Sequence, residues 1–133
     1  MQPSTYLQVQ ECEIPADCFN RLNRIRQQSG GYLDFGMPGL GDNLMILRGH
    51  HWQVWNRRLN TLLMSWDDFR NGERKSLADP VKCTMRVHHS YGRTIIHHIN
   101  DSIRGFCDGF ASRDETAMGM VVQFPVQLVA ANN

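Results

Sequence analysis

The stretch WQVWNRRLNTLLMSWDDF, from Trp52 to Phe69, contains all three tryptophans of the chain. Its large apolar residues recur at alternating spacings of three and four, at Trp52, Trp55, Leu59, Leu62, Trp66 and Phe69. This spacing matches one face of an α-helix, which has about 3.6 residues per turn. Asn71-Gly72 follows and is typical of a left-handed helix end. The pattern therefore predicts an amphipathic helix over Trp52–Phe69 that buries its tryptophans.

Two further helices are predicted on either side of this stretch. Pro15 favours a helix start, and Ser29-Gly30-Gly31 favours its end. The buried side of that helix would carry Cys18, Leu22 and Ile25. Beyond residue 90 the apolar residues again follow a helical period, at Ile96, Ile99, Ile103, Phe106 and Phe110, with Ser90 as the expected N-cap. A β-hairpin of 82–89 with 94–99 is the competing interpretation, but it leaves Ile103 and Phe106 unexplained.

Alternating apolar and polar residues predict strands at 81–89 and 119–130. The second of these carries Pro125, which cannot donate to a strand ladder, so it is expected at a sheet edge or a bulge. Shorter strands are expected at 32–35 and 44–48, and residues 1–13 are expected to form an extended arm or strand.

These elements predict a single α+β domain over residues 1–133, with 1–13 as a possible N-terminal arm. Two to three amphipathic helices would pack on one face of a small, mainly antiparallel sheet. Five of the eleven glycines fall within residues 30–43, which predicts a loop. That loop lacks the spacing of a phosphate-binding motif and is better explained as a connecting or partner-contacting segment.

Composition and charge argue against several classes of protein. The chain is 41% hydrophobic and 20% charged, which is typical of a globular protein. Its 14 basic residues against 13 acidic ones lack the excess expected of a nucleic-acid-binding protein. The N-terminus resembles no signal peptide, and no apolar run is long enough to cross a membrane, so a soluble, cytoplasmic protein is expected. The four cysteines form no Cys-x-x-Cys pair and are expected to be buried thiols.

All six histidines fall in three adjacent pairs, at 50/51, 88/89 and 97/98. His97 and Asp101 are one helical turn apart and could present two ligands to zinc or iron, with His88 on the preceding strand as the third. A catalytic alternative uses His97, Asp101 and His89 in a small hydrolase, either with or without the assistance of a metal. The sequence contains no HExxH and no GxSxG motif. The leading interpretation therefore assigns no catalytic residue, no metal and no cofactor.

A second alternative is contact with nucleic acid. Basic residues lie among the tryptophans, and single-stranded nucleic acid is bound by surfaces that combine charge with aromatic rings. The residues for this alternative are Arg57, Arg58, Arg74 and Lys75. Burial of the tryptophans in a core is the simpler explanation of the same pattern.

The run RVHHSYGRTIIHHINDSIRGFCDGF, from Arg86 to Phe110, joins a strand, a Ser90-Tyr91 turn and an amphipathic helix that closes in Gly109-Phe110. Together with the alternating terminal strand, residues 81–130 resemble in pattern the tail-terminator and tail-completion proteins of long-tailed bacteriophages. The resemblance implies an α+β domain that forms rings at the end of a tail tube and has no catalytic residues.

The leading hypothesis is a non-enzymatic structural or assembly protein that forms a homo-oligomer, in the cytoplasm or in a virion assembled there. Its partners would be itself and other assembly proteins. The predicted terminal edge strand supplies the expected interface, through its other face: Val121, Gln123, Pro125 and Gln127.

Overall fold

The computed structural model describes residues 7–36, 42–68 and 74–116. Its strands form one antiparallel six-stranded sheet in the order β1-β6-β5-β4-β3-β2. Their bounds are β1 Gln8–Ile14, β2 Tyr32–Gly36, β3 Asn43–Arg48, β4 His51–Asn56, β5 Thr61–Asp67 and β6 Val81–Val87. The helical elements are α1 Ala16–Ser29, α2 Ser90–Ile95, the 3₁₀ turn η2 Ile96–His98 and α3 Ile99–Thr116. The predicted α+β class with an antiparallel sheet is confirmed.

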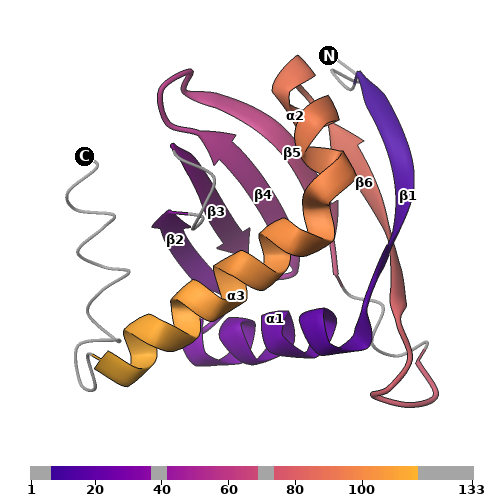
Figure 1. Ribbon diagram of the computed structural model, residues 1–133, viewed down its shortest axis with the longest axis vertical. Helices are drawn as coiled ribbons and strands as arrows, with labels where there is room; N and C mark the ends of the chain where they lie inside the picture. Colours follow the sequence, from indigo (N-terminus) through magenta and orange to yellow (C-terminus); the bar gives the residue numbers. More distant parts are fainter. Residues whose placement is uncertain (1–6, 37–41, 69–73, 117–133) are drawn as a thin grey trace.

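The long helix α3 runs across one face of the sheet, and α1 lies beside it at one end of the strands (Figure 1). Both helices and the sheet contribute to a single buried cluster. At its centre the ring of Phe106 on α3 meets the indole of Trp52 on β4 edge to face, with centroids 6.2 Å apart. The core therefore lies between the helices and this face, which we call the inner face.

The predicted helix over Trp52–Phe69 is wrong. Its described residues form the hairpin of β4 and β5, with Trp52 opposite Trp66 and Val54 opposite Met64. All four of these side chains are fully buried, because alternate residues of each strand point to the inner face. The intervening Trp55 lies half-buried on the outer face, beside an irregularity in the pairing after Val54.

The turn of this hairpin explains why the helix does not form. Asn60 adopts the left-handed conformation, with φ of 51°, which asparagine tolerates better than most residues. The side chain of Asn56 accepts a hydrogen bond of 2.9 Å from the backbone N–H of Leu59. Such side-chain bonds to the backbone compete with helical ones and favour turns. The polar residues between the two apolar groups therefore reverse the chain.

The other predicted helices and strands agree better with the structure. The first helix begins after Pro15 and ends at Gly30, which has φ of 70°, and it buries Cys18, Leu22 and Ile25 as expected. The strands predicted at 32–35 and 44–48 are β2 and β3. The predicted arm contains β1, which pairs with β6 along its whole length.

The strand predicted at 81–89 is β6, which ends at Val87. The helix predicted beyond it also forms, but it is interrupted by η2, and the competing hairpin is absent from this described region. Its N-cap is His89, whose side chain accepts a hydrogen bond from the N–H of Tyr91, and Ser90 is already the first helical residue. The predicted strand 119–130 and the Asn71-Gly72 helix end lie outside the described residues.

One buried carboxylate ties the layers together. Asp68, directly after β5, accepts hydrogen bonds from Arg26 of α1 and from the indole N–H of Trp52. It also contacts Nδ1 of His50 at 3.1 Å. The Asp68 side chain has no exposed area, and that of Arg26 is only 12% exposed. A buried charge is tolerated only where it is paired in this way.

None of the four cysteines forms a disulfide. Cys18, Cys83 and Cys107 are buried, as predicted, and Cys12 is half-buried. Among the described helices, none is long and apolar enough to span a membrane.

The two buried tryptophans provide a matched test of the Asp68 contact. Their indoles stack with centroids 6.1 Å apart, but Trp66 Nε1 has no hydrogen-bond partner among the described residues. We expect Trp52→Phe to lower the free energy of unfolding by about 1.5–3 kcal/mol more than Trp66→Phe, because only Trp52 bonds to a charged group. Urea unfolding measures both values. Equal losses of unfolding free energy in the two variants would contradict the hydrogen bond between Trp52 and Asp68.

Candidate functional site

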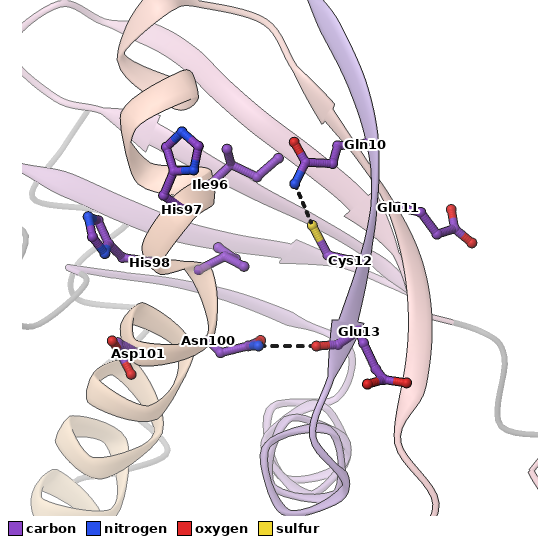
Figure 2. Close-up of a pocket in the computed structure, with 10 residues that line it drawn as sticks. Gln10, Glu11, Cys12, Glu13, Ile96, His97, His98, Asn100 and Asp101 are labelled. Atoms are coloured by element: carbon purple, nitrogen blue, oxygen red, sulfur yellow. Dashed lines mark hydrogen bonds between the residues drawn. The ribbon is translucent and has the colours of Figure 1, made fainter.

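A groove of about 250 Å³ separates β1 from the junction of η2 and α3. Figure 2 shows Gln10 and Cys12 extending from β1 toward the helical segment, where Ile96 points back at them. Glu11 points the opposite way. The inner side of the sheet's first strand is therefore incompletely covered by the helices.

The alternation of β1 explains the polar character of this groove. Gln8, Gln10 and Cys12 occupy the inner positions and lie half-buried, and Ile14 at the end of the row is fully buried. The amide of Gln8 donates to Oε1 of Gln10 at 2.7 Å. Burial therefore increases along β1 toward α1, and only the first part of the strand is open to a partner.

Asn100 links the helix to the strand. Its Nδ2 donates a hydrogen bond of 3.1 Å to the backbone carbonyl of Glu13 (Figure 2). Its Oδ1 is buried and accepts no hydrogen bond within the described part of the chain. Asn100 therefore joins the start of α3 to the end of β1.

The groove holds no activated nucleophile. Burial, and then the charge of Glu11, raise the pKa of the Cys12 thiol above its usual value. The nucleophilic form of cysteine is the thiolate, so this thiol stays protonated near neutral pH.

The histidines proposed as ligands or catalytic groups are not brought together. His97 and Asp101 border the groove, but Asp101 lies on the side of the helix away from β1 and pairs with Arg104 at 3.6 Å (Figure 2). His89 caps α2, and His88 contacts Ser65 of β5. Within residues 7–36, 42–68 and 74–116, no three or more His, Cys, Asp or Glu side chains form a metal site. Both His97/Asp101 hypotheses therefore lack the convergence that they require.

A row of hydrogen-bonded polar side chains crosses the opposite, outer face of β6, β5 and β4. Asp67 accepts from Arg86 at 3.1 Å and contacts Nδ1 of His51 at 2.9 Å. Gln53 lies 3.4 Å from His51 and accepts from the indole of Trp55 at 2.7 Å. Sequence reasoning missed this row because it assigned Trp52–Phe69 to a helix. The polar alternation at 51, 53, 65 and 67 was the available signal.

One contact in this region has the form of a nucleophile and its base. Ser65 Oγ lies 3.0 Å from Nε2 of His88. Nucleophilic catalysis also requires that substrate reach the hydroxyl, but Ser65 is only 2% exposed. The nearby carboxylate of Asp67 is engaged with Arg86 and His51. The contact therefore joins β5 to the residue that follows β6, with the hydroxyl buried.

Electrostatics in the row follow from these contacts. Burial opposes ionisation of Asp67, but its bonds to His51 and Arg86 outweigh burial and lower its pKa. Burial, the charge of Arg86 and then that of His51 lower the pKa of His88 below 6.5. His88 is therefore held neutral near physiological pH.

A second hollow, of about 330 Å³, lies on the outer face. Its apolar lining comes from Leu44, Ile46 and Trp55, with Asp34 and Arg57 among its polar residues. The groove and this hollow lie on different sides of the sheet, so they do not form one site.

The basic residues of the nucleic-acid alternative are divided between two places. Arg57 and Arg58 lie exposed in the turn after β4, whereas Arg74 and Lys75 follow β5 and so lie toward its other end. The guanidinium of Arg74 sits over the ring of Phe19 and donates to Asn20 at 2.7 Å. These four residues therefore do not form one basic surface.

The predicted interface residues Val121, Gln123, Pro125 and Gln127 lie outside the described residues. Comparisons with protein families, with curated proteins and with solved structures found no match to this chain.

The lowered pKa of His88 predicts a pH dependence of stability. Between the folded-state pKa and 6.5 the unfolded chain binds more protons at this residue, so stability rises with pH across that window. We expect His88→Gln to reduce the stability lost on acidification from pH 7.5 to 5.5, as measured by urea unfolding. His98→Gln, at an exposed position, is the control and should leave that loss unchanged. An unchanged loss in His88→Gln would refute this account.

Proposed function

We propose that the protein is a non-enzymatic assembly domain that forms a homo-oligomer. The observation that supports it best is the edge strand β1, which pairs with β6 on one side and with no described strand on the other. Leu7 and Val9 at this edge are 47% and 54% exposed. An open strand edge with exposed apolar side chains is a template for pairing with another chain.

The sequence of β1 protects its edge only in part. Edge strands are commonly protected by charged side chains, especially lysine, by proline or by a covering segment. QVQECEI contains neither proline nor lysine; its charged residues are Glu11 and Glu13, and Asn100 holds the carbonyl of Glu13. The edge-side backbone groups of Val9 and Glu11 bond to no described residue.

The distribution of reactive groups favours assembly over the hydrolase alternative. The hydroxyl of Ser65 is buried, and the pKa of Cys12 is raised. The carboxylates of Asp67 and Asp68 are engaged in ion pairs within the fold. These groups are committed to supporting the sheet.

The resemblance of residues 81–130 to phage tail-terminator and tail-completion proteins is the basis for proposing a virion component, with other assembly proteins as further partners. The terminal segment with Val121, Gln123, Pro125 and Gln127 remains a second proposed contact.

The native mass tests this proposal. Light scattering should give a multiple of the 15.3 kDa chain mass. We expect Val9→Glu to raise the dissociation constant about tenfold, because it adds a carboxylate beside Glu11 and places like charges across a β1 contact.

Leu59→Glu is the matched control, since Leu59 is 45% exposed but lies in the turn after β4. It should leave the mass unchanged. A monomer at every concentration would refute the proposal, and equal effects of both variants would exclude the β1 edge as the contact.

A further inference from the structure

The backbone hydrogen bonds of β6 determine which groups of β1 face the open side. The N–H of His88 donates to the carbonyl of Leu63, toward β5, at 2.8 Å. Backbone groups of successive residues in a strand point to alternate sides. Val87, Met85 and Cys83 therefore direct their backbone groups toward β1 instead.

Their partners in β1 are Gln8, Gln10 and Cys12. The backbone N–H and C=O groups of Val9, Glu11 and Glu13 must then point away from β6, to the open edge. The bond from Asn100 to the carbonyl of Glu13 confirms this direction independently, because it reaches that carbonyl from outside the sheet. No other described residue donates to or accepts from the edge-side backbone groups of Val9 and Glu11.

We infer that a second copy of the chain pairs its β1 antiparallel with this edge, about a two-fold axis between the two Gln10 residues. This inference rests on the proposed function and specifies its contact. Val9 of each copy lies opposite Glu11 of the other, and each pair exchanges backbone hydrogen bonds. Gln8 lies opposite Cys12 of the second copy. The two sheets join into one, with the helices of both copies on the same side.

Charge and hydrogen bonding favour this register over the one centred on Glu11. A two-fold axis perpendicular to the sheet must pass a residue that faces itself. Centring the pair on Glu11 would place two like charges directly opposite each other, which is destabilising. That register also requires the carbonyl of Glu13, which Asn100 already occupies. The register centred on Gln10 avoids the charge conflict. It also leaves the Glu13 carbonyl to Asn100, because Glu13 then lies opposite Leu7, whose N–H already donates to Val87.

The same register completes the groove beside β1. It places the Gln8 side chain of the second copy next to Cys12, a residue that lines the groove. It also covers Val9, which is 54% exposed in a single copy.

Disulfide formation tests the register. Directly opposed residues of a non-hydrogen-bonded antiparallel pair have Cα atoms about 4.5 Å apart, within the range of about 4.4–6.8 Å that a disulfide spans. Gln10→Cys in a Cys12→Ser background should therefore give a covalent dimer on mild oxidation. We expect it to form about a hundredfold faster than with Leu59→Cys in the same background, because pairing raises the effective thiol concentration.

Gln8→Cys with native Cys12 tests the same register by a second route and should also give a covalent dimer. Glu11→Cys in the Cys12→Ser background links fastest only if the pair is centred on Glu11, and that result would overturn the register. If no variant links faster than the control while light scattering still shows an oligomer, this contact is wrong and the proposed function stands. A monomer in light scattering would refute both.

Discussion

The buried carboxylate of Asp68 is the constraint on which the arrangement of layers depends. It lies just beyond β5 and binds Arg26 of α1, Trp52 of β4 and His50. Removing a charge from water costs several kcal/mol unless partners replace the lost solvation. The helix and the hairpin can therefore bury Asp68 only when they come together around it. Its bond to the indole also orients Trp52, against which Trp66 stacks and Phe106 of α3 packs.

The inner face that results is filled by the fold itself. Aromatic and aliphatic side chains from both helices and from the sheet form one cluster on that face. The ionisable side chains of the polar row lie on the outer face, where they bond to one another. His88 contacts Ser65, and Asp67 bonds to His51 and Arg86. The bonds of Asp67 to His51 and Arg86 connect β4, β5 and β6 on the outer face.

The outer edge of β1 pairs with no strand among the described residues. Its inner side chains are glutamines and a half-buried cysteine where the other strands carry apolar residues, so the first strand is the least covered part of the sheet. Main-chain groups supply affinity in strand addition, and alternate side chains supply specificity. In β1 the specificity would come from the positions of Glu11 and Asn100, which are related only through the tertiary structure.

The local sequence determined the elements whose signals are complete within a few residues. Pro15 and Gly30 bound α1, the alternation from Val81 to Val87 makes β6, and the lack of paired cysteine motifs is matched by free thiols. Tertiary structure decided the secondary structure of the described part of Trp52–Phe69. Its spacing fits a helix, but within residues 52–68 Trp52, Val54, Met64 and Trp66 satisfy a hairpin equally well. The spacing of apolar residues shows only which side chains favour burial. Whether they are buried as one helix or as two strands depends on distant partners, here Arg26 and Phe106, which no local pattern contains.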